Sequence, residues 1–255
     1  MATKAEVARA AAEAGNPWDN PYHLGTRGYW AVQDALFDRF VATHDRCVAE
    51  LQELVAGTGG PVLDGSPGSL ALLDDWSRVP VKAGAGWDDG ADWQPAWTGV
   101  APDYEPWPGA MSNLQYLRLE GRVAFYFADV VISRLPGSKW VCWRDKEFNL
   151  NRTGEFLVDL GTFPTPCDPL GTAASSIRGV WRTLLDPSDP EYRPDKEVTL
   201  PGKFEFEIWL RANKLAEDGE LDFQAAPTGD EAGVNRGPYK GSRIKAKIGE
   251  RRGYL

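Results

Sequence analysis

Residues 112–185 constrain the fold more than any other part of this chain, because helix and strand patterns follow one another there with short connections. Ser112 and Gln115 have the spacing of a capping box, in which two side chains satisfy backbone amides reciprocally at the start of a helix. The apolar residues that follow, up to Leu135, fall on more than one helix face, which is typical of a helix covered on several sides. The pattern predicts a central core helix over 112–135.

Two short strands and a second helix are predicted directly after this helix. Residues 139–144 alternate in the way that a strand with two distinct faces requires, and residues 155–160 have the composition to pair with them. Asp168 followed by Pro169 supplies an N-cap and a first-turn proline. We therefore expect a helix that begins there and extends through Leu185.

The flanking regions carry weaker patterns. Apolar residues at helical spacing predict a long helix over 29–56, with Gly57 as its stop. Residues 57–111 hold much of the Gly, Pro and Trp and predict a long loop, in which 69–76 has the potential for a turn or two of helix. Residues 203–211 alternate apolar with mostly charged side chains and predict a strand with one buried face. Its apolar positions are Phe204, Phe206, Ile208 and Leu210.

Together these elements predict an α+β fold in which the central helix packs on a small mixed or antiparallel sheet and the 29–56 helix covers a flank. We expect one main domain over 29–211 that includes the Trp-rich loop 57–111. Residues 1–28 are expected to form an Ala-rich N-terminal arm. Residues 212–255 are expected to form a Gly-rich and basic C-terminal tail.

Charge limits the classes of partner. The formal net charge of −9 argues against a general nucleic-acid-binding protein, since phosphate binding depends on Lys and Arg. Residues 237–255 nevertheless carry six cations against Glu250, a net +5, so that the remainder carries −14. The predicted tail contacts are Lys240, Arg243, Lys245, Lys247, Arg251 and Arg252. Such a tail has the chemistry to contact phosphate, its own acidic body or another copy of the chain, so a homo-oligomer is an open alternative.

The sequence contains no apolar run of membrane-spanning length and does not begin like a secretory leader. These features predict a soluble, cytoplasmic protein with no membrane partner. Cys47, Cys142 and Cys167 are an odd set without CxxC spacing, which predicts small buried thiols in a reducing compartment.

Catalytic chemistry has few candidate residues. His23 and His44 are the only histidines, and the sequence contains none of the common nucleophile, zinc or phosphate-binding motifs. His44 lies seven residues after Phe37 and seven before Leu51, on the apolar side of the predicted helix, so we expect it to be partly buried. We expect no metal ion and no cofactor, and the sequence favours a protein that is not an enzyme.

The strongest functional candidate is an acidic and aromatic segment that begins at Trp87. Its partner-binding candidates are Trp87, Asp88, Asp89, Asp92, Trp93, Trp97, Tyr104 and Trp107. Aromatic faces attract cations, and Trp and Tyr are enriched at the centres of interfaces. The segment therefore predicts contact with a basic protein. The alternatives are that these rings cover the core, or that the carboxylates form a solvated turn or a metal site.

The block Leu117–Leu185, with the strand sequence Lys139-Trp140-Val141-Cys142-Trp143, resembles small uncharacterised bacterial helix–strand–strand–helix domains found near toxin and immunity genes. The resemblance implies a bacterial or phage origin and identifies no functional residue.

We therefore expect a non-enzymatic protein-binding protein of the immunity or inhibitor type that engages a basic partner. One alternative is an assembly subunit of a phage or bacterial particle that uses its terminal arms. The other is a small-ligand binder or carboxylate-based enzyme that uses His44 or the cluster of Asp88, Asp89 and Asp92.

Overall fold

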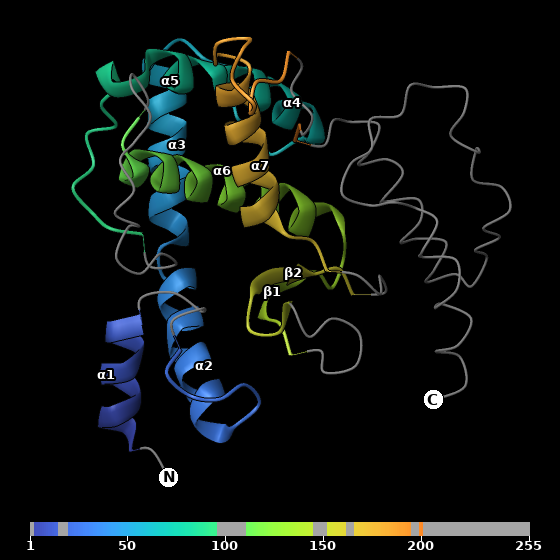
Figure 1. The fold of residues 1–255 in the computed structure, drawn as a ribbon. Coiled ribbons are helices and arrows are strands. Elements are labelled where there is room, and N and C mark those ends of the chain that lie inside the picture. The colour runs from blue at the N-terminus through green and yellow to red at the C-terminus, as the bar shows by residue number, and fades with distance from the viewer. Residues whose placement is uncertain are drawn as a thin grey trace, which may run out of the picture.

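The computed structural model describes residues 3–14, 20–95, 111–144, 152–161, 166–194 and 199–200. Its helices are α1 (Lys4–Ala14), α2 (Arg27–Val41), α3 (His44–Gly57), α4 (Pro67–Trp76), α5 (Arg78–Ala83), the short 3-10 helix η2 (Gly84–Gly86), α6 (Asn113–Arg134) and α7 (Pro169–Arg182). Its strands are β1 (Lys139–Cys142) and β2 (Phe156–Asp159). The described fold is thus mixed, with many helices and one small antiparallel sheet (Figure 1).

Helix α6 crosses the fold between α3 and α7, and it packs mainly against these two helices (Figure 1). Its start has the predicted capping box: the Gln115 amide donates to Ser112 Oγ at 3.3 Å, and the Ser112 amide donates to Gln115 Oε1 at 2.9 Å. An unbroken run of buried residues extends from Arg118 to Ala128, so the helix is covered on every side over that length. The predicted helix limits at 112 and 135 agree with the structure.

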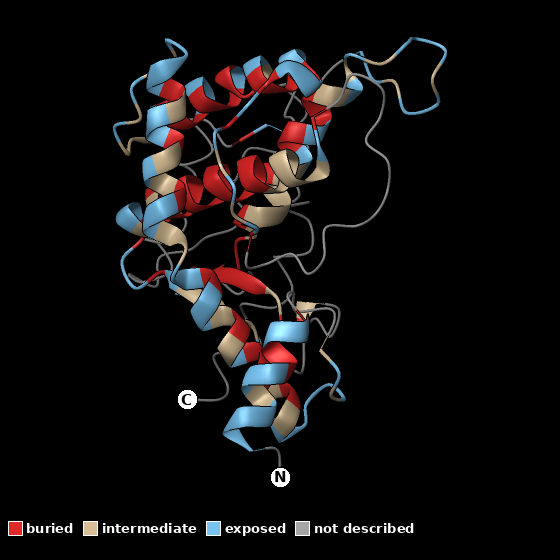
Figure 2. Ribbon diagram, turned by 90° about the vertical axis from the view of Figure 1, so that its left-hand side faces the viewer, coloured by how far each residue is buried: buried red, intermediate tan, exposed pale blue. Residues whose placement is uncertain are grey.

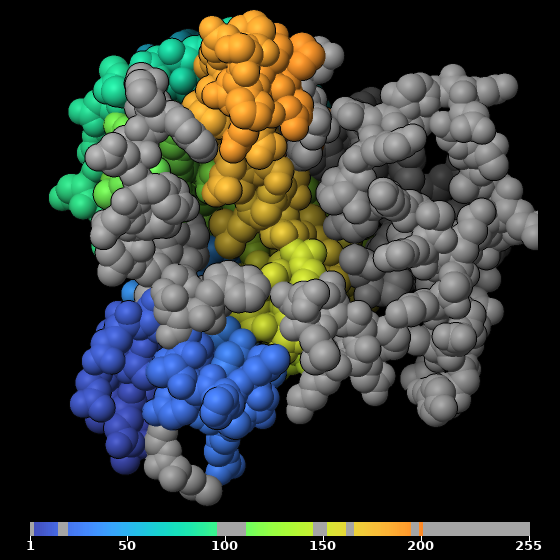
Figure 3. Space-filling model, in the orientation of Figure 1, coloured from blue at the N-terminus to red at the C-terminus, as the bar shows by residue number. Residues whose placement is uncertain are grey.

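The two predicted strands pair as expected. β1 and β2 are antiparallel, with Trp140 opposite Val158. Val158 also exchanges two backbone hydrogen bonds with Cys167, at 2.9 and 2.8 Å, just before α7 begins at its Asp168 cap. The sheet contacts α2 and α7, while α6 contacts it through the rings of Phe125 and Trp140. The hairpin appears at the surface between α2 and α7 (Figure 3).

The predicted helix over 29–56 is wrong in one respect, because it is divided into α2 and α3 at Ala42 and Thr43. The Thr43 hydroxyl donates to the Phe40 carbonyl at 2.7 Å, and the Thr43 amide donates to the same oxygen at 3.0 Å. These bonds close a tight turn in place of a continuous helix. Apolar spacing alone does not reveal where one helix ends and the next begins, since the apolar side chains of both helices face the core.

The predicted long loop over 57–111 is also wrong for its first half, which holds α4 and α5. Ser66 caps α4 and Pro67 occupies its first turn, both of which are standard start signals. The Trp76 indole donates to Thr58 Oγ1 at 2.8 Å and so ties the end of α4 to the end of α3. The turn of helix anticipated over 69–76 is therefore part of a longer helical segment.

The buried apolar residues of the described ranges form two clusters; Figure 2 colours buried residues red. The larger lies among α3, α4, α5, α6, α7 and β2, and the smaller among α1, α2, α3 and the hairpin. Phe40 and Phe125 stack at 4.6 Å between their ring centroids in the smaller cluster, whereas other residues of α6 belong to the larger. Helix α6 therefore links the two clusters.

Helix α1 forms the first part of the segment expected as an N-terminal arm. Ala10, Ala11 and Ala14 are buried against α2, and Arg39 Nη1 donates to the Ala11 carbonyl at 2.8 Å. This part of residues 1–28 therefore packs on its own chain. The predicted strand 203–211 and the tail 212–255 lie outside the described residues.

The described cysteines have no disulfide partner, and Cys47 and Cys167 are buried as expected, while Cys142 is half-buried. Burial raises the pKa of Cys47 and of Cys142 to about 12, so both are poor thiolates near neutral pH. Across the described ranges, none of the helices has the length and apolar content needed to cross a membrane.

Candidate functional site: an acidic cavity over a buried arginine pair

Two arginines on one face of α6 form the base of the candidate site. Arg118 and Arg122 are four residues apart, so their side chains project from neighbouring turns of the helix. Both are buried, and the side chain of Arg122 is 0% exposed. A buried guanidinium is tolerated only when carboxylates and hydrogen bonds replace the water it loses.

Asp89 supplies the first of these carboxylates, and its side chain is also 0% exposed. Its oxygens accept from Arg118 Nε and Nη2 at 2.6 and 2.7 Å, and from Arg122 Nη1 at 2.8 Å. Burial alone would raise the pKa of Asp89, but the two guanidinium groups hold it below its usual range. Asp89 is therefore an anion that fixes residues 87–93 against α6.

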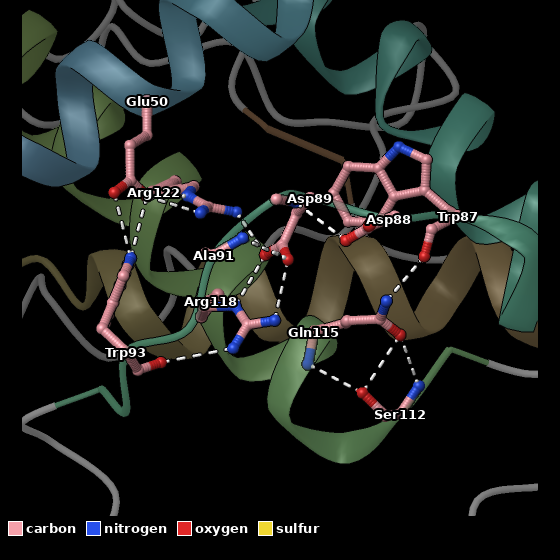
Figure 4. Close-up of polar contacts among 11 residues, drawn as sticks. Glu50, Trp87, Asp88, Asp89, Ala91, Trp93, Ser112, Gln115, Arg118 and Arg122 are labelled. Atoms are coloured by element: carbon pink, nitrogen blue, oxygen red, sulfur yellow. Dashed lines mark hydrogen bonds and ion pairs between the residues drawn. The ribbon is translucent and has the colours of Figure 1, made fainter.

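Glu50 and Trp93 complete the cluster from α3 and from the same segment (Figure 4). Arg122 Nε donates to Glu50 Oε2 at 3.0 Å, and the Trp93 indole donates to Glu50 Oε1 at 3.0 Å. The Arg122 guanidinium lies 5.6 Å from the Trp93 ring centroid, which is within cation–π range. We call Glu50, Asp89, Trp93, Arg118 and Arg122 the arginine hub, in which two cations balance two anions.

A cavity of about 290 Å³ opens beside the arginine hub, between the C-terminal half of α3 and residues 87–89. It is lined by Glu50, Glu53, Leu54, Gly57, Thr58, Trp87, Asp88 and Asp89. Glu50 and Asp89 are balanced by the hub arginines. Glu53 and Asp88 are exposed; within the described ranges no cation pairs with either, and Asp88 accepts only the Gly90 amide, at 2.9 Å. The cavity therefore carries an excess of negative charge.

The structure separates the predicted partner-binding residues into two groups. Asp88 and Asp92 are exposed, and Trp93 is half-buried. Trp87 and Asp89 are buried and line the cavity wall. Trp97, Tyr104 and Trp107 lie outside the described residues, as do all six predicted tail contacts.

Sequence reasoning missed Glu50, Glu53, Arg118 and Arg122. The available signal was the pair Arg118 and Arg122 inside a helix that was predicted to be covered on several sides, because buried charges at that spacing require anionic partners. The sequence pattern did not show which carboxylates would be those partners. Glu50 and Asp89 are 39 positions apart in the numbering and meet only through tertiary packing.

His44 has a different environment from that of a catalytic base. Its Nε2 lies 2.7 Å from Asp129 Oδ1, and its Nδ1 lies 2.8 Å from Asp45 Oδ1. The hydrogen bond to Asp129 raises the pKa of His44 to about 9, against an opposing effect of burial and with further help from Asp45. At neutral pH both nitrogens therefore donate, and neither lone pair is available to accept a proton.

The free energy of unfolding is expected to fall as pH rises from about 6.5 to 9, in proportion to the loss of the His44 proton. Because the folded-state pKa lies above the unfolded value, this contribution is fully present below about pH 6.5 and is lost through pH 9. We expect about 2 kcal/mol for these charge-assisted bonds. Urea unfolding of the wild type and of His44→Gln at pH 6 and pH 9.5 measures the difference, and an equal pH dependence in both proteins would contradict the assignment.

Comparison of the chain with known proteins does not assign it to a family. No family model, curated protein or solved structure matches the chain at a significant level. In the described part of the chain, no group of three or more His, Cys, Asp or Glu side chains is placed to hold a metal ion.

Proposed function

We propose that this chain is a non-enzymatic, cytoplasmic protein-binding protein of the immunity or inhibitor type, which receives a basic segment of its partner at the acidic cavity. The observation that carries the proposal is the position of Glu53 and Asp88. These exposed carboxylates flank one cavity, beside Glu50 and Asp89, whose charges the hub arginines already balance. An incoming Lys or Arg supplies the cation that the two exposed carboxylates lack.

The arginine hub favours recognition by holding the cavity wall in a fixed shape. Asp89 is bound by two guanidinium groups, and Gln115 Nε2 donates to the Trp87 carbonyl at 2.6 Å, so residues 87–89 are attached to α6 at both ends. A rigid wall loses little conformational entropy when a partner binds. The acidic charge of the body also steers a basic partner toward the site over longer distances.

The environments of the reactive groups support a binding role over catalysis. His44 donates from both ring nitrogens, and the pKa of Cys47 and of Cys142 is raised by burial. Asp89, the central carboxylate of the predicted acidic segment, is held as an ion pair. None of these side chains combines access with the protonation state that a nucleophile or base requires.

Reversing the charge of Glu53 is expected to weaken capture of a basic partner at least about tenfold. The probes are an octalysine peptide measured by calorimetry at low salt, and proteins captured from the native lysate. Glu53→Lys is compared with Asp38→Lys, which makes the same change of charge on the exposed side of α2. We expect Asp38→Lys to bind within about twofold of the wild type, since long-range steering alone is a weaker effect.

Equal loss of binding in both variants would show that only net charge matters, and the cavity would then have no specific role. A large, salt-sensitive assembly that disappears when the chain is ended at Asn235 would instead favour the assembly-subunit alternative. Light scattering at low and high salt measures that outcome.

A further inference from the structure

The arginine hub shows how this chain holds a guanidinium group. Arg122 Nη1 donates to Asp89 Oδ2 at 2.8 Å, and Arg122 Nε donates to Glu50 Oε2 at 3.0 Å. One carboxylate therefore comes from the segment after α5 and the other from α3. The Trp93 ring centroid lies 5.6 Å from the same guanidinium. Two carboxylates and an indole together match the planar donors and the flat face of an arginine side chain.

The cavity beside the hub carries a second pair of carboxylates from the same two parts of the chain. Glu53 lies three residues after Glu50 on α3, so these side chains are neighbours on one side of the helix. Asp88 directly precedes Asp89. Glu53 and Asp88 both line the cavity and are exposed, so they are open to a cation that enters from solvent.

Trp87 and Leu54 form the apolar part of the cavity lining. Figure 4 shows the Trp87 carbonyl directed at Gln115, whose Nε2 donates to it at 2.6 Å, and the Trp87 indole extending away from Gln115. The face of an indole attracts cations, and apolar side chains cover the methylene groups of a long basic residue. The lining therefore combines an aromatic and an apolar surface with negative charge.

The end of helix α3 adds to the negative potential of the cavity. Gly57 and Thr58 stand at the C-terminal end of α3 and also line the cavity. A helix dipole is negative at that end and stabilises a nearby cation. The last turn of α3 contains no basic residue, so this stabilisation is available to a cation of the partner.

The size of the cavity and the chemistry of its lining select among basic side chains. Its volume of about 290 Å³ is at the lower limit for cavities that enclose small ligands, so it accommodates one long side chain of a partner segment. A guanidinium offers five N–H donors in one plane to two carboxylates, and it stacks on aromatic faces. It is also less strongly hydrated than an ammonium group, so it loses less on leaving water.

We propose that the cavity binds a single arginine side chain of the partner, with its guanidinium between Glu53 and Asp88 and against the Trp87 indole. This inference rests on the proposed function, since it specifies which basic residue the partner inserts. Lysine reaches the same carboxylates only as a compact, strongly hydrated charge and gains less from the ring. The site therefore selects arginine over lysine.

Calorimetry of the full-length protein with octaarginine and octalysine, which carry equal charge, tests this selection. We expect the wild type to bind octaarginine at least about tenfold more tightly than octalysine. Trp87→Leu removes the ring and keeps an apolar wall, so it is expected to reduce this ratio to within about threefold. Asp38→Asn, at an exposed carboxylate on α2, should leave the ratio unchanged.

Trp87 also belongs to the larger core cluster, so circular dichroism is recorded for its variant. If Trp87→Leu does not fold, Asp88→Asn takes its place, because it removes one carboxylate and keeps an oxygen to accept the Gly90 amide. Loss of one of the two planar pairings should again bring the ratio to within about threefold. A preference for octaarginine that persists in the folded variants would place the selection elsewhere and would overturn the proposal.

Two further results separate this inference from the proposed function. Equal binding of the two peptides that Glu53→Lys still weakens would overturn the selection for arginine and leave the proposed function intact. Binding of neither peptide, or binding that Glu53→Lys does not affect, would contradict the proposed function and this inference with it. Agmatine, a guanidinium without a peptide, should bind at least about tenfold more weakly than octaarginine. Equally tight binding of agmatine would assign the cavity to a small molecule and overturn the proposal.

Discussion

Arg122→Met is expected to lower the free energy of unfolding by about 3–5 kcal/mol, because it takes one of two cations from the buried Asp89 and leaves the half-buried Glu50 without its cation. Arg122 is fully buried and donates to both Asp89 and Glu50, which belong to different parts of the chain. Met has a similar length and apolar character, so the change removes the charge and the hydrogen bonds with little loss of volume. Arg118 still pairs with Asp89, while Glu50 keeps only the Trp93 indole within the arginine hub.

Urea unfolding at pH 7 measures this loss, and Arg9→Met is the matched control. Arg9 and Glu13 form an exposed pair on α1, and such pairs contribute little, so we expect a change within about 1 kcal/mol. Adding Glu50→Gln to Arg122→Met should recover part of the stability, since it removes one of the uncompensated charges. A loss below 1 kcal/mol in Arg122→Met would show that the arginine hub is not needed to hold the site.

Phe40→Ala is expected to cost about 3–5 kcal/mol as well, through a cavity in the smaller cluster. Phe40 is 0% exposed, and its ring contacts those of Phe125, Trp140 and Phe156 at 4.6 to 5.0 Å. These rings come from α6 and from both strands. A single truncation in α2 therefore weakens its attachment to α6 and to the hairpin together.

The same unfolding experiment, followed by far-ultraviolet circular dichroism and by Trp fluorescence, measures the effect. We expect the two signals to coincide in the wild type and in Phe40→Ala, because α6 belongs to both clusters and makes them one cooperative unit. Leu72→Ala, at a side chain that is 53% exposed, should change stability by less than about 1 kcal/mol. Two separate transitions would instead mean that the smaller cluster unfolds independently.

The two effects bear on the proposed binding site in different ways. Loss of Arg122 disturbs the cavity wall directly, so it should weaken binding of a basic segment as well as stability. Loss of Phe40 acts far from Glu53 and Asp88, so the folded fraction of Phe40→Ala should bind normally. This contrast separates damage to the site from general loss of folded protein.

Local chemistry predicted the segments that begin and end on their own signals. The capping box of Ser112 and Gln115, the Asp168-Pro169 start of α7 and the alternation of the two strands all depend on neighbours within a few residues. The same kind of signal was present at Ser66-Pro67, but the surrounding Gly, Pro and Trp residues led to the prediction of a loop. The structure shows α4 there instead.

By itself, the sequence determined the helix from Asn113 to Arg134, the antiparallel hairpin and the helix that follows it, because their start, stop and pairing signals are local. Only the tertiary structure decided that residues 29–56 form two helices, that α1 packs on α2, and that Asp89 and Glu50 meet the two arginines of α6. Residue spacing reports which side of a helix is buried. It does not report which distant carboxylate balances a buried charge, since that choice depends on how the elements pack in three dimensions.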